Sequence, residues 1–502
     1  MFEGMNLAAM LAGHARRRPS HPAIIDRGLV LTFGELDPLV RRTAAHLRAL
    51  GAGPGDVVGV WLDDRAGHLV ALQAVPFLGA VLLPLDPRWT AEEAGRVAAF
   101  FAARLVLAEP GRNLDGIACV AVDDAWDAAV AAATPLDRAA PGGDAPVVLS
   151  LSSGTTGRPK GPMLSHAQFI SRFVIQWATL GFCQQDRYLS ATPLYFGAGR
   201  GFVMGYLFAG ATVILFPPPY EPADLVRAVQ AHGATTLLLV PTLLRRLLAM
   251  AGGGGRLLGG LRVLLSTGAT LHAEERHAVM DRLAANFINY YGSTEGGGVS
   301  VLLPGHGAEA DGSVGQPVFA TDVQVVGGDE RPLPAGETGR IRYRGPAVAG
   351  AFHNDPEASA AAFRDGWYYP GDLGRLDGDG FLYLTGRAKD VIIRGGVNVY
   401  PDEVEQILLA HPAVRDAAVV AWPSPDLGEE VAAFVVAPGA TAADLAAHCR
   451  AHLAPYKVPR EIFAVDDLPR TTMDKVAKDQ LARRLPPLTP TTKPKTAEGS
   501  RG

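Results

Sequence analysis

SSGTTGRPKG, residues 152–161, directly follows an apolar run at 147–151 that reads as a buried strand. Glycine lets backbone N–H groups turn toward an anion, and hydroxyl and cationic side chains supply further donors. A polyphosphate therefore fits this loop, and a nucleotide is the first candidate ligand. The residues expected to contact its phosphates are Ser152, Ser153, Gly154, Thr155, Thr156, Gly157 and Lys160.

The loop differs from the Walker phosphate loop, in which a lysine followed by serine or threonine opens a helix. Lys160 lies between Pro159 and Gly161, and Pro162 follows, so no helix can begin on this lysine in that way. We therefore expect a loop that closes over phosphate groups transiently. The alternative is an ordinary surface loop rich in serine and glycine.

Apolar strand-like runs alternate with longer helical patterns from residue 29 to about residue 292. This alternation predicts parallel strands joined by helices, with ligands bound where strands end. Residues 313–384 read as short strands and turns, and a separate α+β domain of about a hundred residues follows 386. The predicted fold class is α/β, with a large N-terminal domain that includes a small β-rich part, and a smaller mobile α+β domain. The clearest strands of the first part are 57–61, 147–151, 235–240 and 262–265.

Composition excludes several classes of partner. The 502 residues carry a net charge of -5 and no long Lys/Arg block, so neither nucleic acid nor an anionic membrane is expected as a partner. Three cysteines without paired spacing predict no disulfide framework and no zinc site, which favours the reducing cytoplasm. No targeting segment and no run of about 20 apolar residues is evident. Residues 486–502 are almost without apolar side chains, which predicts a disordered tail.

Eight further stretches, in order along the chain, resemble the adenylate-forming superfamily, which comprises acyl-CoA synthetases, adenylation domains of peptide synthetases and luciferases. The resemblance covers residues 7–485. It implies an enzyme that uses ATP and Mg²⁺ to convert a carboxylic acid into an acyl-adenylate. The stretches are LTFGEL (31–36), GAVLLPLDP (79–87), NYYGSTE (289–295), GETGRIRYRG (336–345), YYPGDLG (368–374), GRAKDVIIRGG (386–396), APYKVPR (454–460) and LPRTTMDKV (468–476).

The resemblance also implies roles for residues around the nucleotide. Glu295 offers a hard oxygen ligand for magnesium, with Thr294 beside it as a phosphate donor. Tyr291 resembles the aromatic residue that stacks on adenine. Asp372 resembles the carboxylate that accepts both ribose hydroxyls, and Arg387 a basic residue that reaches the ribose. The remaining residues assigned to the adenine and ribose are Gly268, Ala269, Thr270, Asn289, Tyr290 and Gly292.

The C-terminal part resembles a lid that rotates between two half-reactions. The implied boundaries are 1–386 for the AMP- and acyl-binding domain, 387–389 for a hinge with Lys389 at the hinge position, and 390–485 for the lid. Lys475 resembles the lysine that bridges the carboxylate and the α-phosphate, where a cation lowers the barrier between two approaching anions.

The acceptor tunnel is matched by the stretch Arg394, Gly395 and Gly396. Small residues there leave room for a thin pantetheine arm. A glycine pair is equally typical of a hairpin turn.

Departures from the family bear on the acid and its acceptor. Phe196 stands where many acyl-CoA synthetases have histidine, and it cannot pair with an amino group, so an apolar or aromatic-lined pocket walled by Tyr195, Phe196 and Gly199 is expected. Arg200 can bind a second carboxylate of the substrate, or it can pair with a nearby acidic group or phosphate in a structural role. We favour the structural role. Tyr290, where dicarboxylate ligases have arginine, weakens the case for a malonate-like acid.

Asp474 stands before Lys475 where the family has glycine, and it can alter the geometry of that loop. Coenzyme A is the expected acceptor of the acyl group. Transfer to an amine or amino acid, or to a carrier protein in trans, is the alternative. A luciferase-like oxidase and a binding protein without turnover are weaker alternatives, and both a monomer and a homodimer are compatible with the sequence.

Overall fold

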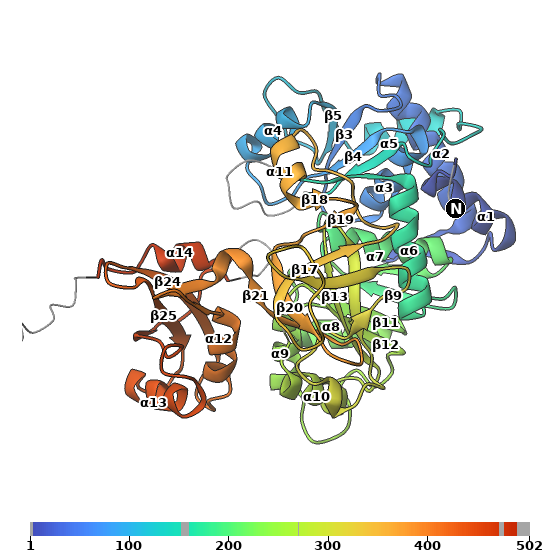
Figure 1. Cartoon of the computed structure of the whole chain (residues 1–502). Coiled ribbons are helices and arrows are strands. Elements are labelled where there is room, and N and C mark those ends of the chain that lie inside the picture. The colour runs from blue at the N-terminus through green and yellow to red at the C-terminus, as the bar shows by residue number, and fades with distance from the viewer. Residues whose placement is uncertain (1–3, 152–159, 270, 471–475, 489–502) are drawn as a thin grey trace, which may run out of the picture. The chain divides into compact units, whose positions relative to one another are not determined.

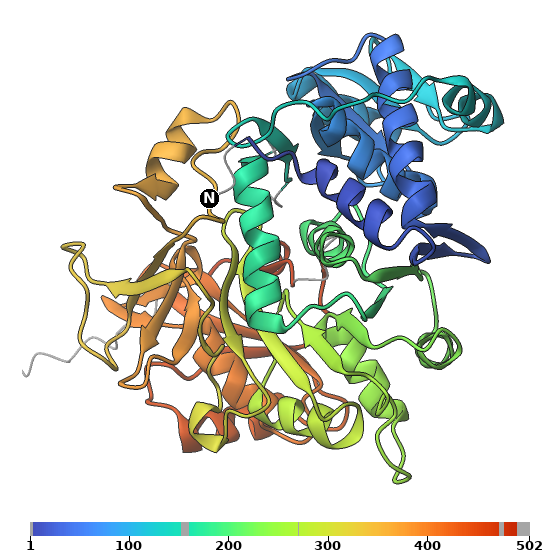
Figure 2. The same ribbon diagram turned by 90° about the vertical axis from the view of Figure 1, so that its right-hand side faces the viewer.

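The computed structural model describes residues 4–151, 160–269, 271–470 and 476–488. The chain forms two compact units. Unit 1 contains 1–324, 342–370 and 377–382, and unit 2 contains 325–341, 371–376 and 383–502. The predicted α/β class with a smaller α+β part is confirmed, and Figures 1 and 2 show the elements from two directions.

The larger sheet of unit 1 is parallel at its centre and antiparallel at its edges. Its order is β15-β14-β13-β12-β11-β9-β10-β1-β2, and the pairs from β13 to β1 are parallel. The carboxyl ends of these central strands therefore meet along one edge. The strands are β1 (Pro22–Asp26), β2 (Leu29–Thr32), β9 (Arg187–Ser190), β10 (Thr212–Leu215), β11 (Thr236–Leu239), β12 (Val263–Ser266), β13 (Phe287–Ser293), β14 (Gly297–Leu302) and β15 (Gln316–Pro317).

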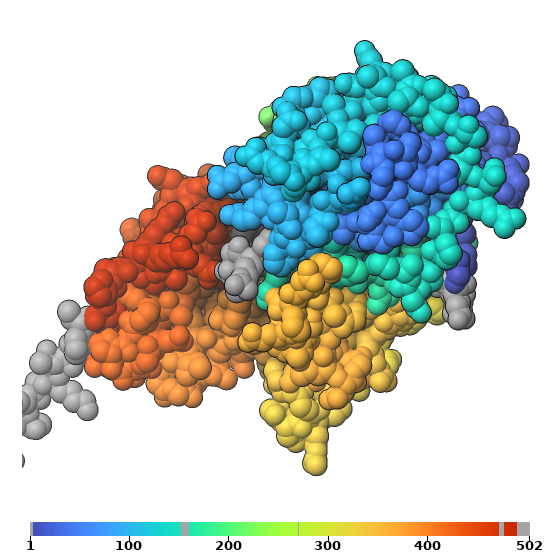
Figure 3. Space-filling model, turned by 90° about the horizontal axis from the view of Figure 1, so that it is seen from above, coloured from blue at the N-terminus to red at the C-terminus, as the bar shows by residue number. Residues whose placement is uncertain are grey.

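A second sheet of unit 1 has the order β6-β5-β3-β4-β7-β8, parallel except for the last pair. In Figure 3 the N-terminal part of the chain, coloured blue to cyan, covers one region of the surface of this unit. The strands are β3 (Val57–Trp61), β4 (Val81–Pro84), β5 (Ala103–Ala108), β6 (Cys119–Ala121), β7 (Pro146–Leu149) and β8 (Met163–Ser165).

Helix α3 (Ala66–Leu78) packs against strands of both sheets. It contacts β1 of the larger sheet and β3 and β4 of the smaller one. Almost every residue of this helix is buried, as its all-round apolar sequence requires. The Asp26 carboxylate, at the end of β1, accepts the backbone N–H of Ala66 at 2.8 Å and so satisfies the first turn of the helix.

Several other helices of unit 1 begin at side-chain caps, as at Thr32, Thr90 and Ser165, where the capping residue and the third residue of the helix bond reciprocally. The helices are η1 (Leu7–Ala9), α1 (Met10–Arg17), α2 (Phe33–Ala49), α4 (Ala91–Phe100), α5 (Asp124–Ala132), α6 (His166–Leu180), α7 (Gly197–Ala209), α8 (Pro222–Ala231), α9 (Pro241–Met250), α10 (Ala273–Arg282), η2 (Ala308–Ala310) and α11 (Pro356–Ala362).

The predicted β-rich part consists of short strands that fall in both units. In unit 1, Tyr343 of β17 pairs with Tyr368 of β19, which also pairs with β18. In unit 2, Gly339 and Arg340 of β17 pair with Gly374 and Leu373 of β20. The strands are β16 (Asp322–Val326), β17 (Gly339–Arg344), β18 (Phe363–Arg364), β19 (Trp367–Tyr368), β20 (Asp372–Leu376) and β21 (Leu382–Arg387).

Unit 2 also contains a sheet of order β23-β22-β25-β24, with β26 parallel to β25. Residues of α12 and α13 share one core with this sheet, and Leu481 of α14 lies in the core on the other side. The elements are η3 (Ala388–Asp390), β22 (Ile392–Arg394), β23 (Val397–Val399), α12 (Pro401–Leu409), β24 (Asp416–Ser424), β25 (Gly428–Val436), α13 (Ala442–His452), β26 (Glu461–Ala464) and α14 (Lys478–Ala482).

The domain boundaries and the hinge implied by the sequence stay predictions. Pro486, at the start of the expected tail, accepts a hydrogen bond from the Trp422 indole at 2.6 Å, and residues 489–502 lie outside the described residues. Within the described ranges, no helix is both long and apolar enough to cross a membrane.

The buried His166 gives the fold a predicted pH dependence. Its Nδ1 accepts the Leu7 N–H at 3.2 Å, its Nε2 has no partner in the described part, and burial lowers its pKa to about 4. The folded state therefore holds the imidazole neutral, whereas the unfolded chain protonates it below about 6.5. Above about pH 6.5 the imidazole is neutral in both states, so His166 does not lower the free energy of unfolding. As the pH falls toward 4, protonation of the unfolded chain lowers the free energy of unfolding by about 3 kcal/mol in total.

We expect His166→Asn, which keeps an acceptor for Leu7, to show a shallower fall in the free energy of unfolding between pH 6.5 and 4 than the wild type. Urea unfolding at a series of pH values measures both slopes. Equal slopes would contradict the assignment of a neutral buried imidazole.

Candidate active site

The expected ligand-binding residues of unit 1 follow the carboxyl ends of its parallel strands. The expected phosphate loop begins two residues after Ser150, which follows β7; residues 191–196 follow β9, residues 267–269 follow β12, and 289–293 form the end of β13. Ligands bind at such edges because the strand ends leave loops and free backbone groups there.

The phosphate-loop residues Ser152, Ser153, Gly154, Thr155, Thr156 and Gly157 lie outside the described residues. The described residues on either side of this loop form backbone hydrogen bonds. The Ser150 N–H donates to the Pro162 carbonyl at 3.1 Å, and the His353 N–H donates to the Gly161 carbonyl at 3.0 Å. Lys160 lies 3.8 Å from the Asp355 carboxylate, and such a long, partly exposed ion pair is weak enough to exchange for a phosphate.

Glu295 is a buried side chain in the turn after β13. Its backbone carbonyl accepts hydrogen bonds from Arg172 Nη2 at 2.8 Å and from the Ala349 N–H at 2.9 Å, and Thr294 precedes it. No cluster of three or more His, Cys, Asp and Glu suited to a metal occurs among the described residues. A single carboxylate fits Mg²⁺ that arrives with ATP, because this ion keeps several waters and takes most other ligands from phosphates.

The expected adenine wall is exposed backbone. Gly268 has φ +99°, a left-handed conformation that glycine adopts without strain, and both it and Ala269 are exposed, whereas Thr270 lies outside the described residues. Exposed N–H and C=O groups at a strand end can contact the edge of a base.

Tyr290 and Tyr291 are neighbours in β13 and therefore point to opposite faces of the sheet. Tyr290 is buried, its ring lies 6.0 Å from Phe202 of α7 in an edge-on arrangement, and burial raises its pKa. Tyr291 is half-buried. The two rings cannot stack on the same face of one base.

Glycines make room around these residues. A Cβ on Gly298 would lie 1.7 Å from the Tyr290 hydroxyl, and a Cβ on Gly292 would lie 2.3 Å from the Gly297 carbonyl oxygen. Asn289 is buried in the same strand. The glycine run after Glu295 is thus explained by close packing.

The expected acid-pocket residues lie in the loop between β9 and α7 and at the start of α7. The rings of Tyr195 and Phe196 are half-buried with centroids 4.5 Å apart. Tyr195 accepts a hydrogen bond from Arg88, whose guanidinium also lies 5.1 Å from the centre of its ring. A Cβ on Gly199 would lie only 2.1 Å from the Pro193 carbonyl oxygen, so this position has no room for a side chain.

Arg200 is buried in the first turns of α7. It donates to backbone carbonyls and to Ser150, and no carboxylate of the described part forms an ion pair with it. Of the two alternatives that the sequence leaves open, these contacts support structural pairing, but with neutral acceptors.

Unit 2 contains the expected ribose pair. Arg387 Nε lies 2.7 Å from the Asp372 carboxylate, which is buried, and the Ala388 N–H donates to the Gly371 carbonyl at 2.8 Å. Lys389 is exposed in η3.

Gly395 and Gly396 form a two-residue hairpin turn. Arg394 pairs with Val397 across it, and both glycines have positive φ, +57° and +84°. Arg394 Nε lies 2.6 Å from the buried Glu430 carboxylate. The hairpin is therefore fixed at its base by an ion pair.

Lys475 and Asp474 lie outside the described residues. On their C-terminal side, Lys478 lies 2.7 Å from the Glu405 carboxylate, and Val476 forms an isolated bridge with Arg470. Burial raises the pKa of Glu405, and the nearby carboxylates help to hold the pKa of Lys478 above its usual value.

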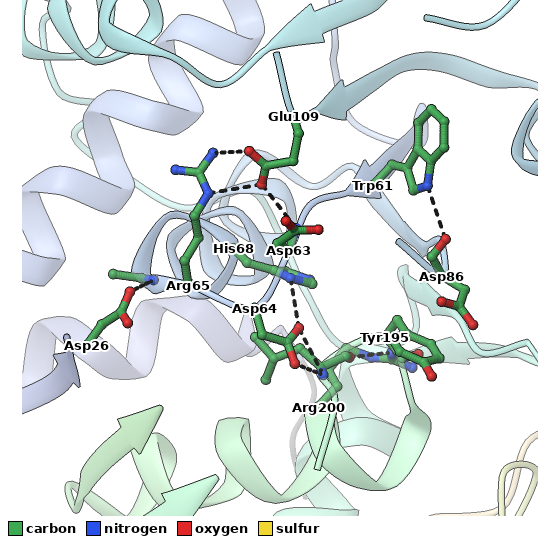
Figure 4. Close-up of polar contacts among 12 residues, drawn as sticks. Asp26, Trp61, Asp63, Asp64, Arg65, His68, Asp86, Glu109, Tyr195 and Arg200 are labelled. Carbon is green, nitrogen blue, oxygen red and sulfur yellow. Dashed lines mark hydrogen bonds and ion pairs between the residues drawn. The ribbon is translucent and has the colours of Figure 1, made fainter. Parts of the chain in front are cut away.

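Sequence reasoning missed two carboxylates in unit 1, and Figure 4 shows both. Asp86 bonds to Arg88, and Asp64 bonds to the backbone of Leu194. Each follows a parallel strand, β4 or β3, so the rule that ligand-side residues follow strand ends could have identified them.

Comparison with known proteins gives a consistent result. The family described as AMP-binding enzyme matches residues 11–353, and the AMP-binding enzyme C-terminal domain matches residues 403–475. A feruloyl-CoA synthase of Amycolatopsis sp. is 36% identical over 482 residues, which are 94% of this chain and 97% of that protein. An indoleacetate–CoA ligase of Aromatoleum aromaticum is 31% identical over 500 residues, covering 95% and 98%.

Solved structures of o-succinylbenzoate coenzyme A synthetase from Bacillus subtilis are also similar. The complex with an acyl-adenylate intermediate and the complex with ATP and a magnesium ion both match with a TM-score of 0.86 and 29% identity. They cover 94% of this chain and 97% and 98% of the solved chains.

We expect Gly199→Ala to lower stability by about 2 kcal/mol, because the added methyl overlaps the Pro193 carbonyl and must displace the pocket loop. Gly201→Ala, in the same helix with open space around the new methyl, is the matched control and is expected to be neutral or to stabilise by up to about 1 kcal/mol. Thermal unfolding measures both. Equal melting temperatures of the two variants would contradict the close approach.

Proposed function

The chain belongs to the AMP-binding enzyme family, and from this we infer that it is an AMP-forming acid–CoA ligase. A carboxylate oxygen of the acid attacks the α-phosphorus of ATP, and pyrophosphate leaves. The thiol sulfur of coenzyme A then attacks the carbonyl carbon of the acyl-adenylate, and AMP leaves. The observation that supports this function is that several residues expected to bind the nucleotide, including Gly268, Asn289 and Glu295, lie at or soon after strand ends of unit 1.

In unit 1, Glu295 is proposed to hold Mg²⁺, whose charge balances the phosphates when it is bound. Thr294 and Lys160 donate to phosphate oxygens. Tyr291 stacks on adenine beside the exposed backbone of Gly268 and Ala269. The burial of Glu295 and the exposure of that backbone support these assignments.

In unit 2, Asp372 is proposed to accept the ribose hydroxyls. Its ion pair with Arg387 supports the role, because the guanidinium keeps the carboxylate ionised and oriented as an acceptor. Lys475 is proposed to bring the acid carboxylate and the α-phosphate together, and Lys389 to act as the hinge of the lid.

The acid is proposed to be aromatic or cyclic. Three rings support this proposal, the half-buried Tyr195 and Phe196 and the buried Tyr290. Flat rings pack well against such walls. Similar proteins include a feruloyl-CoA synthase and an indoleacetate–CoA ligase, both named for aromatic acids or their thioesters.

The turn at Gly395 and Gly396 is proposed to face the pantetheine arm. A cytoplasmic location is also proposed, because the three cysteines, Cys119, Cys183 and Cys449, are all free, as is usual in a reducing compartment.

Product analysis tests the proposed reaction. The protein is incubated with ATP, Mg²⁺, and benzoate, ferulate, indoleacetate, 2-succinylbenzoate, malonate or sulfoacetate, together with coenzyme A or with a mixture of amines. We expect AMP, pyrophosphate and an aryl-CoA thioester, with aromatic acids preferred over malonate. An amide in place of the thioester would overturn the acceptor, and a lack of AMP with every acid would overturn the function.

Lys475→Ala is expected to lower the rate of acid-dependent ATP–pyrophosphate exchange by at least about 100-fold, because it removes the cation that stabilises the developing charge. Thioester formation from supplied acyl-adenylate and coenzyme A should persist, since that step does not need this cation. The second reaction is thus an internal control for folding. Full exchange activity in the variant would show that Lys475 has another role.

A further inference from the structure

Arg200 is a buried cation without an anionic partner in the described part of the chain. Its side chain is 1% exposed, and its guanidinium donates to the carbonyls of Leu194 and Tyr195 at 3.3 and 3.0 Å and to Ser150 Oγ at 3.1 Å. Its Nε has no hydrogen-bond partner among the residues that the structure describes. Burial lowers the pKa of Arg200 to about 9, which still leaves the guanidinium charged near neutral pH.

Burying such a charge costs free energy, because the guanidinium loses its hydration and is hydrogen-bonded only to neutral acceptors. An apolar residue of similar length would fill the same space without this cost. The charge of Arg200 therefore has a role other than filling space in the core.

Asp64 binds the same short segment from another direction. Both of its carboxylate oxygens accept the Leu194 N–H, at 3.2 and 3.0 Å, and His68 Nδ1 lies 3.5 Å from Oδ1. Leu194 is thus bonded at its N–H to a nearly buried anion and at its carbonyl to a buried cation. Figure 4 draws Asp64, His68, Tyr195 and Arg200 together with their polar contacts.

The segment held in this way carries the aromatic residues of the proposed acid pocket. Tyr195 belongs to it and Phe196 follows directly, with the two rings in contact. The far end of the Tyr195 side chain is held by Arg88, which is paired with Asp86 at 2.7 Å. Movement of the Leu194–Tyr195 backbone would therefore move the wall of the pocket.

The third contact of Arg200 leads to the phosphate loop. Ser150 closes the base of that loop through its N–H bond to the Pro162 carbonyl at 3.1 Å, and its own carbonyl is approached so closely by Gly161 that a Cβ there would lie 2.9 Å away. Its hydroxyl accepts the bond from Arg200. One guanidinium thus contacts both the pocket segment and the base of the loop.

We propose that Arg200 and Asp64 are positioning residues that hold the Leu194–Tyr195 segment, and that Arg200 links this segment to Ser150 so that acid binding and ATP binding strengthen each other. The proposal rests on the function proposed above. When one ligand binds and fixes its site, the link also restrains the other site. The second ligand then loses less conformational entropy on binding, which is the physical basis of positive coupling.

The test compares the wild type with Arg200→Met, Ser150→Ala and the double variant. The dissociation constant of the best acid of the panel is measured by calorimetry with and without a saturating non-hydrolysable ATP analogue, and the ratio of the two constants gives the coupling. We expect a ratio of at least about 5 in the wild type, near 1 in each single variant, and no further loss in the double variant.

Arg276→Met is the control for loss of a buried arginine elsewhere in unit 1, because Arg276 also donates to two backbone carbonyls, of Leu303 and His306, and its Nε has no partner among the described residues, although unlike Arg200 it lies 3.6 Å from the Asp311 carboxylate. It should leave the ratio unchanged. Arg200→Lys, which keeps the charge and can still donate, should restore part of the coupling, and Asp64→Asn, which keeps an acceptor for Leu194, should preserve the order of preference among the acids better than Asp64→Ala.

Ser150→Ala removes only a hydroxyl, so it keeps the test decisive if Arg200→Met fails to fold. A wild-type ratio near 1, unchanged coupling in Ser150→Ala, or an equal loss in Arg276→Met would overturn the proposal even if the wild type forms AMP and thioester. A wild type that forms no AMP with any acid would instead overturn the proposed function.

Discussion

The packing of helix α3 between the two sheets of unit 1 is the constraint on which the site depends. An apolar helix that contacts β1 on one side and β3 and β4 on the other fixes how the two sheets meet. The Asp26 carboxylate, on the larger sheet, accepts a backbone N–H from the first turn of that helix. This hydrogen bond fixes the start of α3 against β1, in addition to the apolar packing. Between the two sheets, Arg200 of α7, the helix after β9, contacts Ser150, which directly follows β7.

Buried polar groups at these strand ends lower stability in exchange for a defined geometry. The Leu194 backbone is bonded to both Asp64 and Arg200, and Tyr195 is held by Arg88. A site that must place a carboxylate beside a phosphate needs supporting contacts of this kind, because small displacements of reacting groups have large effects on rate. The polar network is therefore best understood as the support of a catalytic surface.

The sequence predicted the elements and the chemical class well, and the contacts between distant segments poorly. The apolar run at 57–61 predicts β3, because apolar spacing is a local property of the sequence. Residues expected to bind the nucleotide could be proposed because their motifs are contiguous in the sequence. Asp64 and Arg200 are 136 positions apart (200 minus 64), and no local pattern indicates that both bond to Leu194. The role of Gly199 likewise depends on the path of the Pro193 backbone, which only the fold defines.

The central claim, that the acid is activated as an acyl-adenylate before thioester formation, can be tested by following one oxygen atom. In this chemistry the carboxylate oxygen that attacks the α-phosphorus stays with the phosphate when the thiol displaces AMP. Turnover of ferulate labelled with ¹⁸O in its carboxylate, or of the best acid of the panel labelled in the same way, should therefore place one labelled oxygen in AMP, as read by mass spectrometry. Label in inorganic phosphate, with ADP as the nucleotide product, or AMP without label, would contradict the account.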